Sequence, residues 1–262
     1  MPKGIQSIEL GGRLLEALAS ADAPVSLSIL ARDAGMSPSK ARRYLVSLTR
    51  IGLVAQEEPS ARYDMGWFAM RIGLAALARA DVLRQARPLL VRLRETINET
   101  IALVLWLSGG PTVVHFEPSD RGLLRVVAPL GAALPLLGTA AGRVFAAFEA
   151  ADRVSPLLGR EMRTKPGRAA AGTPAVSRPE AARLIEQTRA RGLARTLGEA
   201  ADGISTMAVP VRDRDGGVLA AIVALGHRGS FDARWNGAIA TALRSTALEL
   251  AHQMGHAARA VA

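Results

Sequence analysis

Residues 26–54 read S-L-S-I-L-A-R-D-A-G-M-S-P-S-K-A-R-R-Y-L-V-S-L-T-R-I-G-L-V, and this stretch decides the fold of the N-terminal part of the chain. Ala31 and Ala41 are small enough for two helices to cross closely, and Gly35 between them can turn the chain. Ser37-Pro38 can cap and open the second helix, because proline is tolerated at the first helical position. The pattern predicts a helix–turn–helix.

The second helix of this motif is predicted to have two different faces. At 3.6 residues per turn, one arc is expected to pack on the core; it holds Ala41, Tyr44, Leu45, Leu48 and Ile51. The opposite side holds Ser39, Arg42, Arg43, Val46 and Arg50. No acidic residue occurs from 34 to 56, and a basic face without carboxylates suits a helix that enters the major groove of DNA. The alternative is a solvated basic face on an ordinary helical hairpin.

These side chains can be assigned different tasks on DNA. The residues near the start of the helix are candidates for base edges and adjacent phosphates: Ser39, Arg42 and Arg43. Three further cations are candidates for phosphate contacts, which position a protein without reading sequence: Lys40, Arg50 and Arg62. A double-stranded operator is therefore the expected partner.

Three segments are expected along the chain. Two short extended runs, 53–56 and 62–65, surround a turn and predict the wing of a winged helix that completes a DNA-binding domain over residues 1–66. Residues 67–80, W-F-A-M-R-I-G-L-A-A-L-A-R-A, are apolar on more than one face and predict a linker helix. This helix is expected to bury itself against a second copy of the chain, the alternative being its own domain. Residues 81–262 form the other domain.

The period of apolar residues changes after residue 81. A helix is expected over 82–97, with a kink or break at Pro88, and others over 139–150 and from the capping box 177–180 to 191, with a final helix capped by Asp232. Strands are expected at 101–108, 112–116, 123–128, 193–197, 205–212 and 218–225. This order favours an α+β fold, in which a central antiparallel sheet is flanked by helices.

Composition excludes several classes of protein. The 262 residues are 49% hydrophobic and 21% charged, which is typical of a globular chain, and the absence of cysteine excludes disulfides and thiolate metal sites. The net charge of +10 divides into +3 for residues 1–80 and +7 for the rest, so it suits a polyanion without locating one. The start of the chain lacks the apolar core of a signal peptide, and glycines and prolines interrupt the apolar stretch 126–142. We expect a cytoplasmic protein with no membrane partner.

The sequence gives little sign of catalysis. It contains no nucleophile elbow, phosphate loop or dinucleotide fingerprint, and no nucleophile–base pair is evident among its serines and four histidines. His252 and His256 are four residues apart, but a solvated helix end explains them better than a metal site. We therefore expect no enzymatic activity, metal or cofactor.

The chain resembles the IclR family of bacterial transcriptional regulators over almost its whole length. In the N-terminal part the resemblance rests on Leu30-Ala31, Gly35, Ser39, Arg43-x-Leu45-x-x-Leu48-x-x-x-Gly52-Leu53-Val54 and Arg62-Tyr63-x-x-Gly66. In the C-terminal part it rests on Pro135-Leu136, Thr139-Ala140-Ala141-Gly142-Arg143, Arg191-Gly192 and Gly203-x-x-Thr206-x-Ala208-x-Pro210-Val211-x-Asp213-x-x-Gly216. The C-terminal pattern is the more specific, because unrelated regulators share winged helices.

The resemblance implies a homodimer or tetramer that binds operator DNA through an N-terminal winged helix–turn–helix. It also implies a GAF-like α/β C-terminal domain with an antiparallel sheet, which binds a small-molecule effector, often an organic or aromatic acid. The chain departs from the family at three positions: Thr206 stands where a cysteine is usual, Leu137 where a histidine is frequent, and Thr196 where some members carry an acidic residue.

The effector is expected at the start of the 139–150 helix, where the free amides of Ala140 and Ala141 could hold a carboxylate. Hydroxyls could come from Thr139, Thr196 and Thr206, and an apolar wall from Leu134, Leu136, Met207, Val223 and Leu225. The alternative for each of these residues is a place in the core. The expected effector is a small, partly apolar or aromatic carboxylate that modulates operator binding.

Two other functions are possible for such a chain. One is a metabolite-binding or catalytic C-terminal domain whose N-terminal motif serves only dimerisation, and the basic segment 37–56 argues against it. The other is an architectural DNA binder without sequence preference, which would leave the large second domain without a purpose.

Overall fold

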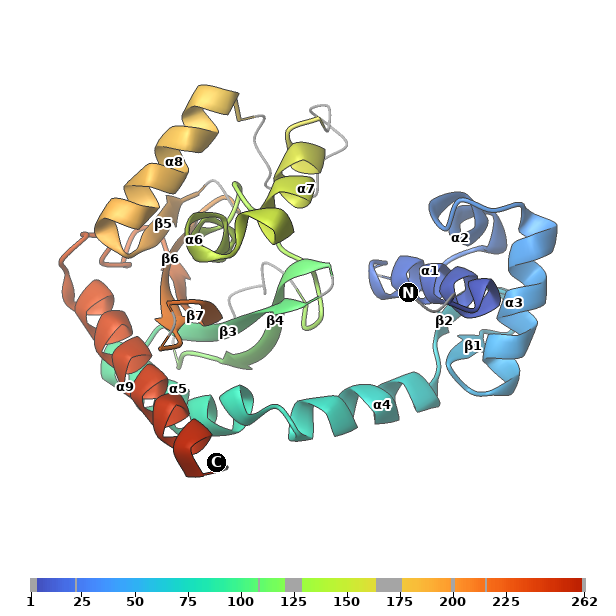
Figure 1. Cartoon of the computed structure of the whole chain (residues 1–262), viewed down its shortest axis with the longest axis horizontal. Coiled ribbons are helices and arrows are strands. Elements are labelled where there is room, and N and C mark those ends of the chain that lie inside the picture. Colours follow the sequence, from blue (N-terminus) through green and yellow to red (C-terminus); the bar gives the residue numbers. More distant parts are fainter. Residues whose placement is uncertain are drawn as a thin grey trace. The chain divides into compact units, whose positions relative to one another are not determined.

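The computed structural model describes residues 4–21, 23–107, 109–120, 129–163, 176–198, 201–214 and 216–260, the last five without their side chains. The chain divides into two compact units, residues 1–80 and 81–262. Figure 1 labels the helices and strands of both units.

The first unit is a small helical bundle with a two-stranded wing. Its elements are α1 (Gln6–Ala19), α2 (Leu27–Asp33), α3 (Pro38–Arg50), β1 (Val54–Gln56), β2 (Tyr63–Met65) and α4 (Trp67–Ala78). Strand β1 pairs antiparallel with β2, which confirms the winged helix–turn–helix predicted from the sequence.

Small residues let the three helices of the motif meet. Ala31 and Ala41 are both buried, and Gly35 adopts a φ of +66° that favours glycine. Ala31 and Ala41 belong to one apolar cluster that also contains Leu14, Leu18, Leu30, Leu45, Val54 and Tyr63. Ile51 does not join this cluster: it follows the last turn of α3 and is 54% exposed, so its predicted place on the buried arc is wrong.

Helix α4 has no buried residue in the chain as it stands. Its large apolar side chains are exposed, with Trp67 at 60%, Met70 at 63% and Leu74 at 60%. These three recur at helical spacing and form a stripe along one side of the helix.

The second unit is a five-stranded sheet with helices on both faces. Its helices are α5 (Asp81–Ile97), α6 (Ala140–Phe148), α7 (Ala151–Glu161), α8 (Arg178–Arg191) and α9 (Ala238–Ala260). Its strands are β3 (Thr100–Leu107), β4 (Gly110–Glu117), β5 (Ala194–Leu197), β6 (Ile204–Arg212) and β7 (Val218–His227). The order is β4-β3-β7-β6-β5, and every neighbouring pair is antiparallel.

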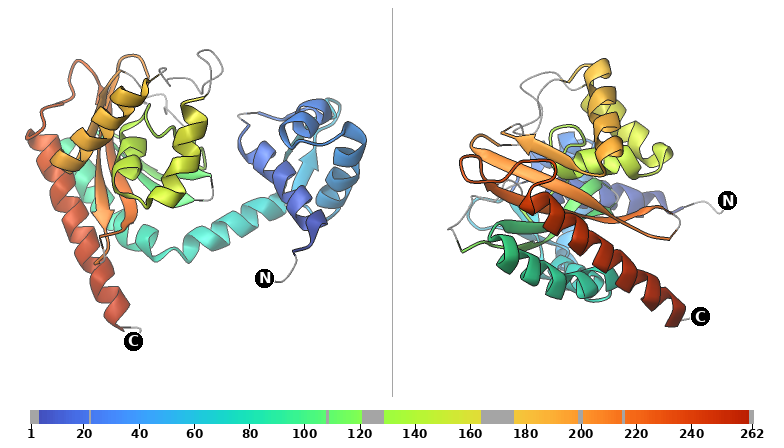
Figure 2. Two further views of the ribbon diagram at one scale, coloured as in Figure 1. Left: turned by 45° about the horizontal axis from the view of Figure 1, so that its top comes forward. Right: turned by 90° about the vertical axis from the view of Figure 1, so that its left-hand side faces the viewer.

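Helices α5 and α9 lie against one face of this sheet, and α6 lies against the other with α7 and α8 outside it (Figure 2). Apolar side chains of α6 pack against the sheet, and Val144 and Phe145 are completely buried there. The antiparallel sheet between helices confirms the α+β fold class.

The structure differs from the sequence-based expectations at two helices. Helix α5 continues through Pro88 without a break, because buried leucines on both sides of the proline hold it on the sheet; they include Leu83, Leu89 and Leu90. Helix α7 was not predicted. Its apolar stripe, with Val154 at its centre, is short, and the helix is stabilised by packing on α6. The strand predicted at 123–128 lies outside the described residues.

Within the described ranges, no helix combines the length and the apolar character needed to cross a membrane.

Candidate DNA-reading face and effector cavity

Helix α3 is held in place at its start and along one side. The Ser37 hydroxyl accepts a hydrogen bond from the Lys40 amide at 3.4 Å, which satisfies one of the free donors of the first turn. Ala41 and Leu45 are completely buried against α1 and α2. The opposite side of α3 is therefore turned to solvent.

The predicted DNA-binding residues of α3 all lie on solvent-accessible surface: Ser39, Lys40, Arg42, Arg43 and Arg50 are exposed. Among the residues that the structure describes, the four cations of this set have no ion-pair partner. No described carboxylate therefore neutralises their charge, which is available to a polyanion. We call the surface formed by these five residues the α3 face.

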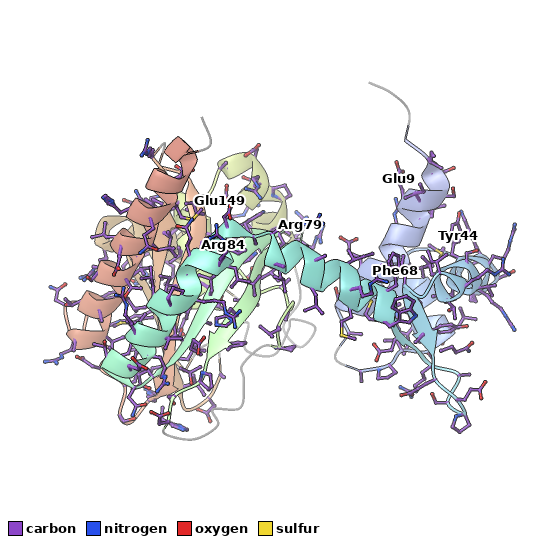
Figure 3. The ribbon with its side chains drawn as sticks, turned by 90° about the horizontal axis from the view of Figure 1, so that it is seen from below. Glu9, Tyr44, Phe68, Arg79, Arg84 and Glu149 are labelled. Atoms are coloured by element: carbon purple, nitrogen blue, oxygen red, sulfur yellow. The ribbon has the colours of Figure 1, made fainter. Side chains whose placement is uncertain are left out.

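A polar groove borders the α3 face on the side of α1. Its lining combines Ser39, Lys40 and Arg43 with four residues that are not among the predicted DNA contacts: Ser7, Ser37, Tyr44 and Ser47. Figure 3 shows Tyr44 on α3 beside α1, where its ring packs over Gly11. The approach of Ser7 to α3 is a tertiary contact, so no local pattern could have revealed it.

Arg62 lies on the wing and stays exposed, but its guanidinium has a partner. It donates a hydrogen bond to the backbone carbonyl of Pro24 at 3.1 Å. The adjacent Tyr63 forms a backbone bridge with Val25. These contacts tie the wing to the chain that leads into α2 and fix the place of the Arg62 charge.

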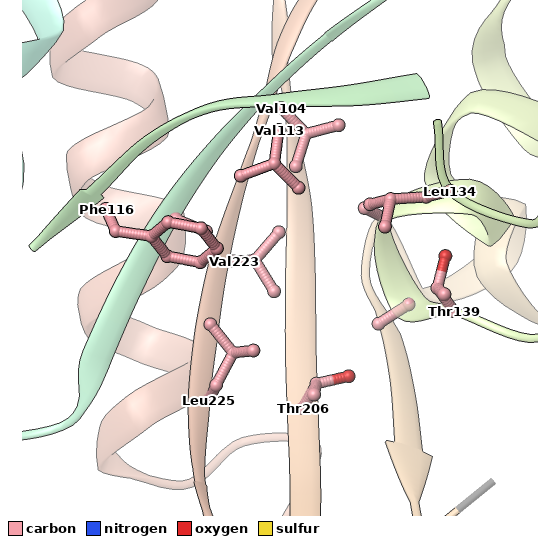
Figure 4. Close-up of a pocket in the computed structure, with 11 residues that line it drawn as sticks. Val104, Val113, Phe116, Leu134, Thr139, Thr206, Val223 and Leu225 are labelled. Carbon is pink, nitrogen blue, oxygen red and sulfur yellow. The ribbon is translucent and has the colours of Figure 1, made fainter. Parts of the chain in front are cut away.

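In the second unit, a cavity of about 40 Å³ lies between the sheet and the start of α6 (Figure 4). Seven of the predicted effector residues line it: Leu134, Thr139, Ala140, Ala141, Thr206, Val223 and Leu225. The wall also contains Ala102, Val104, Val113 and Phe116 from β3 and β4. The lining is apolar apart from two threonines and the backbone of α6.

The contribution of β4 could not be derived from simple alternation. The pairing of β3 with β4 is irregular, since Leu103 faces His115 and Val104 faces Val113. The extra residue between these pairs lets Val113 and Phe116, three residues apart, line the same cavity.

The polar groups of the cavity are partly committed to the fold. The Thr139 hydroxyl accepts from the Gly142 amide at 2.9 Å and donates to the Pro135 carbonyl at 2.8 Å, so it caps α6. The Thr206 hydroxyl pairs with the Thr196 hydroxyl at 2.7 Å. The amides of Ala140 and Ala141 lie in the first turn of α6, which has no intrahelical acceptor for them. Among the polar groups of the lining residues, these two amides are therefore the ones that the helix itself leaves without a partner.

The structure places three of the residues predicted for the effector site elsewhere. Leu136 is buried with Ala146 and Val154 between α6 and α7, away from the cavity. Thr196 is completely buried behind Thr206 on the next strand. Met207 follows Thr206 on β6, so its buried side chain points to the opposite face of the sheet.

The segment before α6 is fixed by a carboxylate of α7. Glu161 accepts hydrogen bonds from the amides of Leu136 at 2.7 Å and Leu137 at 3.0 Å. The guanidinium of Arg143 donates to the Leu137 carbonyl at 2.8 Å. These contacts position the strip of chain that carries Leu134 into the cavity wall.

A helix–turn–helix with an exposed basic face, followed by an antiparallel sheet domain with a small apolar cavity, agrees with the models that match the chain. The IclR helix-turn-helix domain matches residues 7–58, and the C-terminal domain of bacterial transcriptional regulator IclR matches residues 74–252. The chain belongs to the IclR family of bacterial transcriptional regulators.

Relatives of this IclR-family protein are transcriptional regulators. It is 32% identical over 216 residues to the glycerol operon regulatory protein of Streptomyces griseus, covering 82% of each chain. It is 36% identical to the crystal structure of Pseudomonas aeruginosa HmgR, covering 96% and 98% of the two chains with a TM-score of 0.59. An IclR homologue from Microbacterium hydrocarbonoxydans, solved as a complex with 4-hydroxybenzoate, shares the fold at 17% identity and a TM-score of 0.71, covering 95% and 98%.

Proposed function

We propose that this IclR-family regulator reads its operator with the α3 face. The observation that carries the proposal is the set of exposed cations on α3 that have no ion-pair partner among the described residues. Ser39, Arg42 and Arg43 contact base edges and adjacent phosphates, while Lys40 and Arg50 contact phosphates only. Arg62 adds a phosphate contact from the wing.

Selection of genomic fragments by the purified protein tests this proposal. We expect one enriched site with two related half-sites, at about physiological salt. Arg43→Ala should weaken this site by roughly 5- to 150-fold and leave binding to bulk DNA nearly unchanged, which corresponds to about 1–3 kcal/mol for a base contact. Arg50→Ala should weaken all DNA alike and lower the salt dependence by about one phosphate. Equal loss on all sequences for both variants would refute the assignment of Arg43.

We further propose that residues 81–262 form an effector domain whose ligand is a small, partly apolar or aromatic carboxylate. The walls of the cavity beside α6 are apolar and suit a hydrocarbon or ring, and the first-turn amides of α6 suit an anionic group. A ring enters only if the walls move apart, because an apolar cavity that holds benzene measures about 150 Å³. The structural neighbour that holds 4-hydroxybenzoate supports this class of ligand. Such a ligand alters DNA binding only if it prefers one arrangement of the protein over another.

Thermal stabilisation by 4-hydroxybenzoate and by benzoate, with their uncharged amides as controls, tests the effector site. Thr206→Leu should abolish any stabilisation because the larger side chain fills the cavity, while effector-free DNA binding stays unchanged. Thr206→Val, which keeps the volume, is the matched control and should retain it. If Thr206→Leu also lost DNA binding, Thr206 would be a core residue rather than part of a site.

We also propose a cytoplasmic homo-oligomer, dimer or tetramer, joined through the linker helix 67–80. The exposed stripe of Trp67, Met70 and Leu74 supports it, because water-exposed apolar stripes of this kind mark interfaces. Two DNA-binding domains, each comprising residues 1–66, would then reach half-sites about 34 Å apart or a multiple of that distance.

A further inference from the structure

One apolar side chain interrupts the polar surface of α3. Val46 is 51% exposed, and it lies three residues after Arg43 and four before Arg50. Residues at these separations are neighbours on a helix surface. The side chain is therefore enclosed by the α3 face, although it was not included among the predicted DNA contacts.

The fold itself gives no reason for valine at this position. The apolar cluster of the first unit is filled from α3 by Ala41 and Leu45, with Tyr44 and Leu48 partly buried against it, and Val46 lies on another side of the helix. Val46 takes no part in that cluster. A β-branched residue is also a weaker helix former than alanine or lysine, so an exposed helix position does not favour it.

We infer that Val46 contacts the C5 methyl group of a thymine in the operator and makes this base part of the recognised sequence. The inference rests on the proposed function, in which the α3 face enters the major groove. The thymine methyl is the apolar group that base pairs display there, whereas the other base edges offer hydrogen-bond donors and acceptors. An exposed valine between two arginines complements a methyl between polar base edges.

The position of Val46 also restricts where this thymine lies. Arg43 and Val46 are separated along the helix axis by about 4.5 Å, close to the spacing of about 3.4 Å between base pairs. We therefore expect the thymine within one or two base pairs of the base that Arg43 reads, once in each half-site.

Replacing single thymines by deoxyuridine tests the inference, because this change removes the methyl and keeps the hydrogen-bonding pattern. The operator is first selected with the wild-type protein, and each thymine of a half-site is then replaced in turn. We expect one position per half-site at which binding weakens about fourfold, the ratio for about one methyl group removed from water. Val46→Ala should lose this sensitivity, and Val46→Thr, which keeps one methyl, should retain part of it.

Ile51→Ala is the matched control, since Ile51 has a similar exposure of 54% but follows the end of α3 on another side. This variant should show the wild-type response to deoxyuridine, and melting curves of all variants should agree because both side chains are exposed. The inference is overturned if the wild-type protein binds equally well after deoxyuridine replaces any thymine. It is also overturned if Val46→Ala responds to deoxyuridine as strongly as the wild type does. Neither result would affect the proposed function. Wild-type protein without any sequence preference would instead refute the proposed function and the inference with it.

Discussion

The hydrogen bond between the buried hydroxyls of Thr196 and Thr206 can be tested by substitutions that hardly change the shape of either side chain. The two residues face each other across β5 and β6, their oxygens are 2.7 Å apart, and they are 0% and 4% exposed. Thr206→Val keeps the volume but leaves the Thr196 hydroxyl buried without its partner. We expect this to lower the free energy of unfolding by about 1–3 kcal/mol.

The double variant Thr196→Val/Thr206→Val should recover most of this loss. Replacing both partners of a buried hydrogen bond by apolar groups of the same shape is nearly neutral, so no unsatisfied donor remains. The two substitutions should therefore be strongly non-additive, with a coupling energy about equal to the sum of the two single losses.

Urea unfolding followed by tryptophan fluorescence measures the effect, at one protein concentration because self-association changes apparent stability. In a Trp67→Phe background, the remaining signals come from Trp106 and Trp235, both in the second unit. Thr188→Val is the control, because the buried Thr188 hydroxyl donates to the Leu184 carbonyl of its own helix. After the substitution this carbonyl still accepts from a backbone amide of the helix, so the loss of unfolding free energy should be smaller. Additive losses in the double variant would refute the coupling of the two hydroxyls.

Three further predictions follow from contacts elsewhere in the chain. Glu161→Ala should destabilise the second unit by about 1–3 kcal/mol and speed hydrogen exchange at the Leu136 and Leu137 amides, which lose their acceptor; unchanged exchange would contradict the contact. Leu74→Glu should shift the sedimentation of the protein to a smaller species, because it places a charge on the α4 stripe, while Ala75→Glu on another side should not. The side-chain hydrogen bond from Arg234 holds the pKa of the Asp232 carboxyl well below its usual range, so its stabilisation is present at neutral pH and lost as the pH falls below about 4. Asp232→Asn should accordingly cost more stability at pH 7 than near pH 3, and a pH-independent difference would contradict this.

Most of the fold could be predicted because the local signals agree with the tertiary environment. The Ser37-Pro38 start of α3, the Gly35 turn and the capping box at 177–180 each act within a few residues, and the structure shows the Ser37 and Ser177 hydroxyls as caps. The strands that the structure describes were predicted to within a few residues for the same reason, since apolar alternation is a local property.

The failures have a common physical cause in packing between distant segments. Helix α5 passes through Pro88 because buried leucines on both sides compensate for the missing backbone donor. Helix α7 carries a proline within it and is short, so its helicity depends on the contact with α6. In both cases an internal proline disfavours a continuous helix, and tertiary packing stabilises it.

The sequence by itself determined the helix–turn–helix, the basic face of α3 and the family, because these depend on residue type and short-range spacing. The tertiary structure decided which side chains share the cavity. Thr139 and Thr206 meet there although they are far apart in the chain, and Val113 and Phe116 join them through an irregular strand pairing. Leu136, two residues after Leu134, packs toward α7 instead, because the irregular segment does not keep the alternation of a strand. Local pattern fixes what a residue can do, and packing fixes what it faces.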